Sequence, residues 1–161
     1  KTRDIAVGGN PEGAAISRDG KYLWVGDNGK PQVRVIDLKT GETIVALASD
    51  SVAFRVGISP DGRTAVTSNL MTGTINLFDV AELKPLRSIK ISGSPKAMQV
   101  TMAFSADSRR VYVAETGLDT VAEVDLVTGN VLRRIAAGRN GDGLGISKRR
   151  CKLGSAANDR D

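Results

Sequence analysis

The chain has 161 residues, of which 40% are hydrophobic and 25% are charged, and its formal net charge is +5. This composition is typical of a globular domain, and no apolar run approaches the ~20 residues of a membrane-spanning helix. Residues 139–161 hold six basic against three acidic residues, so the rest of the chain is nearly balanced at 17 against 15. A nucleic-acid partner is therefore not expected.

Histidine is absent, and Cys151 is the only cysteine. A single cysteine excludes an intramolecular disulfide. The lack of histidine excludes Ser-His-Asp and Cys-His catalysis, histidine-ligated haem and the usual imidazole-bearing zinc sites. We expect no cofactor, no metal and no catalytic residues.

Short strand-like runs recur along the chain. The first set reads GAAIS, YLWVGD, QVRVID and ETIVAL, and the third reads TMAFS, RVYVAE, TVAEVD and NVLRRI. These runs are rich in β-branched and aromatic residues and are bounded by turn signals. The pattern predicts an all-β fold with three copies of a four-stranded antiparallel unit, at about residues 12–47, 54–91 and 100–135, and essentially no helix.

Two columns of residues fix the repeat. One serine in each copy stands 42, 46 and 42 residues from the next. In the first three copies this serine begins a Ser-x-Asp segment, and another aspartate lies 18 residues after the aspartate of that segment. The columns are Ser17, Ser59, Ser105 and Ser147; Asp19, Asp61 and Asp107; and Asp37, Asp79 and Asp125. Four strands in about 42 residues is typical of a β-propeller blade.

The turns carry their own signals. Asp19-Gly20 and Asp61-Gly62 favour tight hairpins, because glycine accepts positive φ without steric cost; Ser108 replaces this glycine in the third copy. Leu83 replaces the glycine of the later Thr-Gly turns. The repeated aspartates lie on separate blades, so we interpret them as acceptors for turn amides rather than as ligands of one metal.

Both ends of the repeat are partial. RDIAVGGNPEG aligns with RRIAAGRNGDG, which predicts an additional outer strand at residues 3–7 and the first strand of a further blade at residues 143–147. Three complete blades are fewer than a closed propeller has, so we expect about half a ring that self-associates or needs further blades.

The repeat pattern breaks after residue 147. Residues 148–161 are predicted to form a divergent, disordered tail. A native divergent tail and a frameshift or fusion junction at Lys148 both remain open explanations, because removing one base from a plausible codon set restores the expected Asp-Gly hairpin.

The repeat units resemble the YVTN family of propeller repeats, in which an S-P-D-G hairpin is followed by an apolar Y-V-T-N strand. GGNPEGAAISRDGKYLWVGD and RVYVAETGLDTVAEVDLVTG carry the resemblance, which covers residues 5 to about 147. It implies a propeller of about seven blades and a periplasmic or extracellular, cell-surface location. No signal peptide is visible in a chain that starts at Lys1.

The loops between blades, and those between the second and third strands of each blade, are expected on one face of such a propeller. Their mixed charges and amides suit a protein or small polar ligand. The candidate ligand-binding residues are Asn10, Glu12, Asp27, Asn28, Arg55, Asn69, Lys96, Glu115, Thr116, Arg139 and Asn140.

Other features have structural interpretations. Trp24, Val66 and Tyr112 share one column and are expected to fill the space between blades, although an aromatic there could also stack on a ligand. The glycines near residues 8–13 and 138–145 precede strands rather than helices, so we interpret them as turns between blades and not as a phosphate cradle.

The sequence favours a non-enzymatic propeller scaffold that binds through one rim. The alternative is part of a propeller enzyme, either a lactonase-like hydrolase or a cofactor-holding redox domain. A lactonase needs convergent acids and amides on the innermost strands; Glu12 and Asp142 suit it, whereas Phe54 and Val100 do not. A WD-repeat-like cytoplasmic platform is a third possibility, but its Gly-His and Trp-Asp marks are absent.

Overall fold

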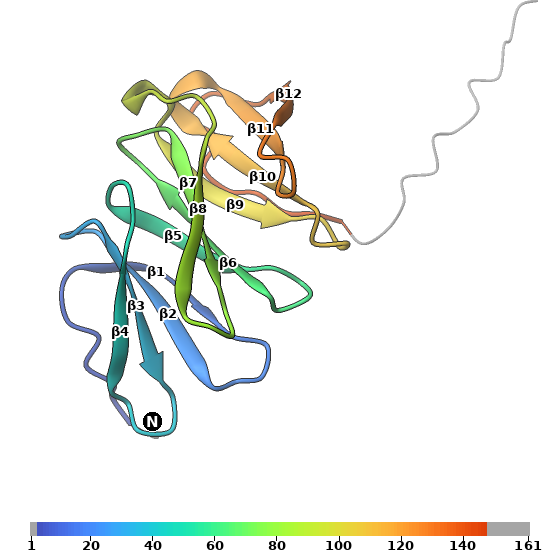
Figure 1. The fold of residues 1–161 in the computed structure, drawn as a ribbon. Helices are drawn as coiled ribbons and strands as arrows, with labels where there is room; N and C mark the ends of the chain where they lie inside the picture. The colour runs from blue at the N-terminus through green and yellow to red at the C-terminus, as the bar shows by residue number, and fades with distance from the viewer. Residues whose placement is uncertain (1–2, 148–161) are drawn as a thin grey trace, which may run out of the picture.

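The computed structural model describes residues 3–147, which form three four-stranded antiparallel sheets with no α-helix among them (Figure 1). We call the sheets blades 1, 2 and 3. The strands of blade 1 are β1 (Pro11–Ile16), β2 (Tyr22–Asp27), β3 (Gln32–Asp37) and β4 (Thr43–Ala48). Those of blade 2 are β5 (Ala53–Ile58), β6 (Thr64–Asn69), β7 (Thr74–Asp79) and β8 (Lys84–Lys90). Those of blade 3 are β9 (Gln99–Phe104), β10 (Arg110–Glu115), β11 (Thr120–Asp125) and β12 (Val131–Ala136).

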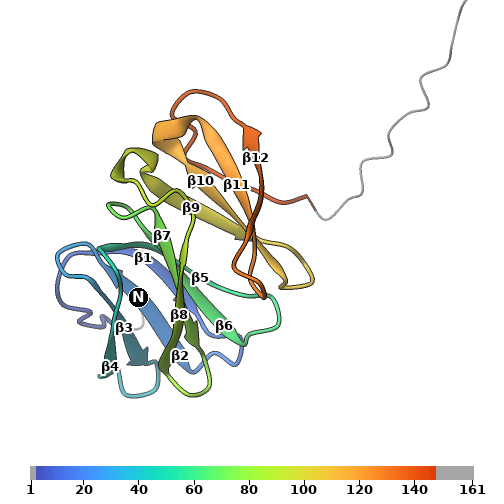
Figure 2. The same cartoon turned by 45° about the horizontal axis from the view of Figure 1, so that its top comes forward.

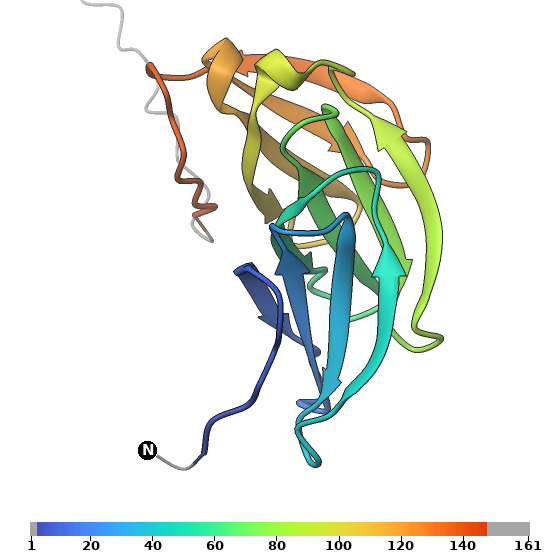
Figure 3. The ribbon, with the colours of Figure 1, turned by 90° about the vertical axis from the view of Figure 1, so that its left-hand side faces the viewer.

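The blades fan out around their first strands. Within each blade the spatial order of the strands is the chain order, and β5 lies against both β1 and β9. The sheets follow one another from blue through green to orange in Figures 2 and 3. The predicted all-β architecture with four antiparallel strands per copy is confirmed.

The Ser-x-Asp hairpins repeat atom for atom. The Oγ of Ser17 donates to Oδ1 of Asp19 at 2.6 Å and accepts from the amide of Tyr22 at 2.9 Å. Ser59 and Ser105 make the same pair of contacts in blades 2 and 3. Each hairpin thus supplies hydrogen bonds to its own backbone, which explains why the Ser-x-Asp segment recurs.

The two residues that replace a turn glycine, Ser108 and Leu83, have the positive φ of the glycines that they replace. Ser108 has a φ of 61°, close to the 73° of Gly20, and Leu83 has a φ of 50° where Gly41 has 82°. These side chains therefore occupy left-handed backbone positions that cost a non-glycine residue about 1 kcal/mol.

Apolar side chains fill the spaces between neighbouring blades. Trp24, Val33 and Val35 of blade 1 pack with Val56 and Phe78 of blade 2. A second cluster joins blades 2 and 3 and includes Val66, Ile75, Leu77, Val111, Val113 and Val124. Trp24 and Val66 thus have the predicted inter-blade role, whereas Tyr112 is only half-buried.

Two predictions for the ends differ from the structure. Residues 3–10 and 137–147 contain no strand, although residues 3–7 and 143–147 match strands of the complete copies in sequence. A strand requires a ladder of backbone hydrogen bonds with a neighbouring strand, and within residues 3–147 neither segment forms one. The predicted tail at 148–161 lies outside the described residues.

We expect Gly20→Ala to destabilise the fold by about 1 kcal/mol, because a β-carbon disfavours the left-handed conformation. No heavy atom lies within 4 Å of the position that this β-carbon would take, so steric clashes do not contribute. Urea-induced unfolding would measure the loss. Gly138→Ala is the matched control, since Gly138 also has open space around it but no positive φ; equal losses in the two variants would contradict the explanation.

Candidate functional site

The loops that follow β2, β4, β6, β8, β10 and β12 emerge at one end of the blades, which we call the rim. The amide of Asn28, after β2, donates to the carbonyl of Asn10 at 2.8 Å, and the amide of Asn140 donates to Oδ1 of Asp119 at 2.8 Å. These contacts join inter-blade segments to loops between second and third strands, as the sequence predicts.

A charged pair bridges blades 1 and 2 at the rim. Glu12 of β1 and Arg55 of β5 form an ion pair at 2.7 Å, and both side chains are about one-third exposed, at 37% and 33%. The Arg55 guanidinium also lies 4.8 Å from the ring centroid of Phe54. This pair is fixed on strands and still accessible to a ligand.

The blade 3 part of the rim is more open. Lys96 lies in the 3-10 turn Pro95–Ala97, which contacts a second turn, Thr116–Leu118. The Oγ1 of Thr116 donates to the carbonyl of Gly141 at 2.9 Å. Lys96, Arg139 and Asn140 are exposed. The third copy is four residues longer than the second, since Ser105 follows Ser59 by 46 residues where Ser59 follows Ser17 by 42. The segment before β9 in this longer copy contains the turn that places Lys96 in solvent.

Three of the eleven candidates are buried rather than displayed in loops. Asp27, Asn69 and Glu115 are each the last residue of a blade's second strand, and none is exposed. The Asp27 side chain bonds to the blade and to the segment that enters it. Asn69 and Glu115 bond to partners in their own blade, and those partners bond to the entering segment. The sequence analysis predicted these residues in loops, because they border stretches that contain glycine or proline. In the structure, each of them still pairs with the first strand of its blade.

In blade 1, Asp27 pairs with Arg34 of β3 at 2.6 Å, and Arg34 also donates to the carbonyl of Val7 at 2.7 Å. Oδ1 of Asp27 accepts the amides of Gly29 and Asn10. Burial alone would raise the pKa of Asp27, but these amides, Gln32 and the Arg34 charge outweigh it and lower the pKa. Asp27 and Arg34 therefore clamp the segment that enters blade 1.

Blade 2 builds the corresponding clamp from an amide pair and the Asp50 carboxylate. Asn69 donates to Oδ1 of Asn76 at 2.6 Å, and this oxygen also accepts the amide of Asp50, in the segment between blades 1 and 2. The Asp50 carboxylate accepts from Asn76, Thr74 and Ser88. The entering segment is held as in blade 1, without an arginine in the clamp.

Blade 3 uses a charged pair again, but from another strand. Glu115 pairs with Arg134 of β12 at 2.7 Å, and Arg134 donates to the carbonyl of Ile91 at 3.1 Å. Ile91 lies in the segment that enters blade 3. The three clamps thus share one position on the second strand and one role, while their partner residues differ.

The sequence analysis missed the partners Arg34, Asn76 and Arg134. Each is a polar residue inside a strand, as in QVRVID and TINLFD. A polar side chain among buried strand positions requires a partner, and that signal could have identified Arg34 and Asn76. Arg134 lies on the largely exposed strand β12, where a polar residue carries no such signal.

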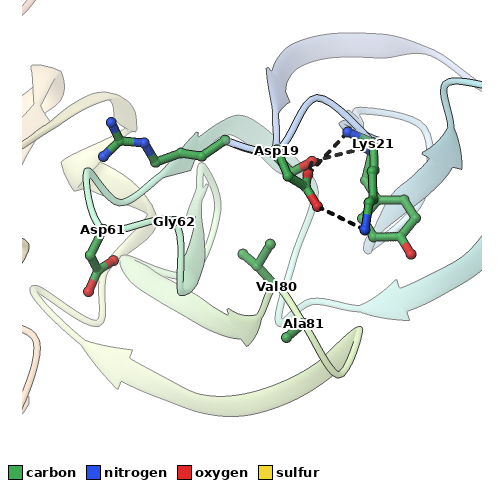
Figure 4. A pocket seen from close by; sticks show the side chains of 9 residues that line it. Asp19, Lys21, Asp61, Gly62, Val80 and Ala81 are labelled. Carbon is green, nitrogen blue, oxygen red and sulfur yellow. Dashed lines mark hydrogen bonds and ion pairs between the residues drawn. The ribbon is translucent and has the colours of Figure 1, made fainter.

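The opposite end of the blades carries the repeated aspartates. Oδ1 of Asp37 accepts the amides of Lys39 and Thr40, and Asp79 and Asp125 do the same in blades 2 and 3. The interpretation of these aspartates as turn acceptors is confirmed. A hollow of about 400 Å³ lies beside them, between Asp19, Lys21, Asp61 and Val80 (Figure 4). It was not anticipated from the sequence.

Stability is expected to fall in acid. Hydrogen bonds from Ser17, Ser59 and Ser105 hold the pKa of Asp19, Asp61 and Asp107 below the ordinary value. Because these pKa values are lower in the folded than in the unfolded chain, the carboxylates stabilise the fold above about pH 4, and this stabilisation is lost as pH falls through the folded pKa values.

Thermal unfolding between about pH 7 and pH 2 would test this expectation. The midpoint should change little down to about pH 5 and then fall. The triple variant Asp19→Asn/Asp61→Asn/Asp107→Asn should show a shallower fall, and identical curves for the two proteins would contradict the assignment.

Residues 3–147 contain no group of three or more Cys, Asp or Glu side chains that could hold a metal ion. They also contain no helix with the length and hydropathy needed to cross a membrane.

The fold resembles known propellers. Hydrazine synthase of Kuenenia stuttgartiensis aligns with a TM-score of 0.75 and 24% identity, over 83% of this chain and 39% of its own. Dihydro-heme d1 dehydrogenase NirN aligns with 0.67 and 21%, over 84% and 30%. The WD40 repeats of RRP9 align with 0.69 and 9%, over 85% and 40%.

The chain has the fold of a β-propeller. It spans well under half the length of each of these propellers, and the identities are too low to indicate more than the fold. No family model and no curated protein matches the sequence. Propellers of this shape include enzymes as well as WD40 proteins, so the fold alone does not assign an activity.

Proposed function

We propose that this chain is a non-enzymatic propeller scaffold that binds a protein or a small polar ligand through the rim. The observation that carries the proposal is the contrast between two sets of rim residues. Glu12, Arg55 and Lys96 are accessible. Asp27, Asn69 and Glu115 are buried in the clamps that hold the segment entering each blade.

A clamped rim suits binding. Ligand contacts made by preorganised side chains carry a smaller ordering cost than contacts made by mobile loops. Arg55 is held between Glu12 and the Phe54 ring, so its guanidinium is oriented before a partner arrives. The accessible cations Arg55, Lys96 and Arg139 favour a partner with carboxylates or other acceptor groups.

We further propose that the repeats are of the YVTN type and that the protein works in the periplasm or at the cell surface. Tyr112-Val113-Ala114-Glu115 stands where the family has Y-V-T-N, and its last residue is a clamp residue. An oxygen-bearing side chain at this position in all three blades supports the resemblance. Localisation of an epitope-tagged protein by cell fractionation would test the compartment; recovery in the cytoplasm would overturn it.

The double variant Arg55→Ala/Lys96→Ala is expected to lower partner binding at least about tenfold without unfolding the blades. The measurement is quantitative capture of proteins from a periplasmic extract on immobilised chain, followed by mass spectrometry. The control is Ile44→Ala/Leu86→Ala, which changes exposed side chains of the outer part of the blades. Binding that survives the rim variant and is lost in the control would contradict the proposal.

A separate assay tests the enzymatic alternative. The purified chain, supplied with divalent metal ions, would be assayed against a panel of lactones. We expect no hydrolysis above background, because the acids at the inner ends of the blades are single residues such as Glu12 and Asp142, each bonded to a neighbour. Hydrolysis at an enzyme-like rate would overturn the non-enzymatic assignment.

A further inference from the structure

The outward face of blade 3 repeats a surface that is an interface elsewhere in the same chain. Blades 1 and 2 each bury four side chains against the following blade. These are Trp24, Val33, Val35 and Leu47 in blade 1, and Val66, Ile75, Leu77 and Ile89 in blade 2. The same register gives Tyr112, Val121, Glu123 and Ile135 in blade 3.

On blade 3 this face is not covered by a sheet within the described residues. Ile135 is 40% exposed, and an apolar hollow of about 390 Å³ lies between Tyr112, Val121 and Ile135. Leu144 and Ile146, from the extended segment after β12, line its other side. The surface therefore has the apolar character of an inter-blade contact and only partial cover.

An arginine in the segment or strand that precedes a blade donates to backbone carbonyls in the turn between the third and fourth strands of that blade. Arg87 of β8 donates to the carbonyls of Leu126 and Val127, in the β11–β12 turn of blade 3. Arg3 makes the equivalent contact in blade 1, where it donates to the carbonyl of Lys39 in the β3–β4 turn at 3.1 Å. In blades 1 and 3, the turn between the third and fourth strands thus accepts a hydrogen bond from an arginine that precedes the blade.

Arg133 occupies this arginine position on blade 3. It stands 46 residues after Arg87, which is the spacing between blades 2 and 3. Its Nε donates to Oε2 of Glu123 at 2.6 Å, and its side chain is 66% exposed. Glu123 is buried between Arg133 and Arg110, at the place that Leu77 holds in blade 2.

We propose that the outward face of blade 3 binds blade 1 of a second copy of this chain, head to tail, with Arg133 taking the place of Arg3 at the carbonyl of Lys39. Blade 1 carries the matching residues, because Leu23, Ile36 and Leu38 stand in register with Ala65, Phe78 and Val80, which cover the Trp24 face. Within one chain Ile36 is fully buried and Arg3 holds the carbonyl of Lys39, so the proposed contact displaces the segment that begins at Arg3. The contact would continue the interfaces between blades 1 and 2 and between blades 2 and 3. It does not depend on the rim.

This contact is heterologous, so association should proceed beyond a dimer, to a ring if the geometry closes and to a chain of molecules otherwise. Sedimentation velocity of the full chain from about 1 to 100 µM should show a mass that rises with concentration. Val121→Asp should abolish the rise, and Arg133→Ala should shift it to about tenfold higher concentration. Leu86→Asp, on an exposed residue of β8, is the control and should leave it unchanged.

Far-UV circular dichroism shows whether Val121→Asp is folded, and Arg133→Ala tests the same contact from an exposed residue. Cross-linking then identifies the two surfaces. In a Cys151→Ser background, Lys39→Cys and Leu132→Cys chains would be treated with a bismaleimide, separately and mixed. We expect cross-links between residues 39 and 132 only in the mixture. A chain that stays monomeric at about 100 µM, or a 132–132 cross-link as the main product, would overturn the proposal.

Discussion

Replacing Trp24 by alanine is expected to destabilise the fold by about 3–5 kcal/mol. Trp24 is fully buried between blades 1 and 2, and its ring centroid lies 6.1 Å from that of Phe78. Alanine would leave a cavity bounded by Val33, Val56 and Phe78, which are held on three different strands and can relax only in part. Urea-induced unfolding followed by circular dichroism would measure the loss.

Trp24→Phe separates packing from hydrogen bonding at this site. The indole Nε1 of Trp24 is buried and has no hydrogen-bond partner within residues 3–147. Phenylalanine removes this unsatisfied donor while retaining much of the apolar volume, so we expect a loss well below that of alanine. Leu132→Ala, on a side chain that is 48% exposed, should change stability by less than about 0.5 kcal/mol. Similar losses for all three variants would contradict the central packing role of Trp24.

Replacing Arg34 by asparagine is expected to cost about 3–5 kcal/mol, because it leaves the Asp27 carboxylate buried without its cation. Asp27 is 1% exposed, and the Arg34 contact at 2.6 Å is one of its four hydrogen-bond contacts. Arg34→Asn also removes the bond to the carbonyl of Val7. The free energy of unfolding at neutral pH, from urea titration, is the measurement.

The double variant Asp27→Asn/Arg34→Asn provides the sharper test. It gives blade 1 the amide pair that Asn69 and Asn76 form in blade 2. With no charge left unpaired, the double variant should be more stable than Arg34→Asn alone by about 1–3 kcal/mol, although it carries one more substitution. Losses that simply add would show that the two side chains are not coupled.

The parts of this structure that the sequence predicted are those in which one residue type recurs at one spacing. Ser17 and its equivalents recur because a single hairpin geometry needs a hydroxyl and a carboxylate two residues apart. The apolar column at Trp24 and Val66 recurs because each blade packs on the next. Such regularities can be read from columns of aligned repeats.

The clamps could not be predicted in the same way. Each blade completes its clamp with a different partner, on β3 in blade 1, on β7 in blade 2 and on β12 in blade 3. No column of the repeat therefore contains all the partners. The displayed residues Glu12 and Arg55 were predicted, but their pairing depends on which first strands lie side by side. Spacing within one blade does not contain that information.

The fan of sheets has a consequence for how the molecule unfolds. Blade 2 packs on both of its neighbours, whereas blades 1 and 3 each pack on blade 2. In such linear arrays, stability is approximately a sum of the intrinsic stability of each unit and nearest-neighbour interface terms. Blade 2 takes part in both inter-blade clusters, so opening it disrupts two interfaces, while opening blade 1 or blade 3 disrupts one. Among the three blades of residues 3–147, local opening is thus graded from the outer two inward, and the strands β5 to β8 form the most protected cooperative unit.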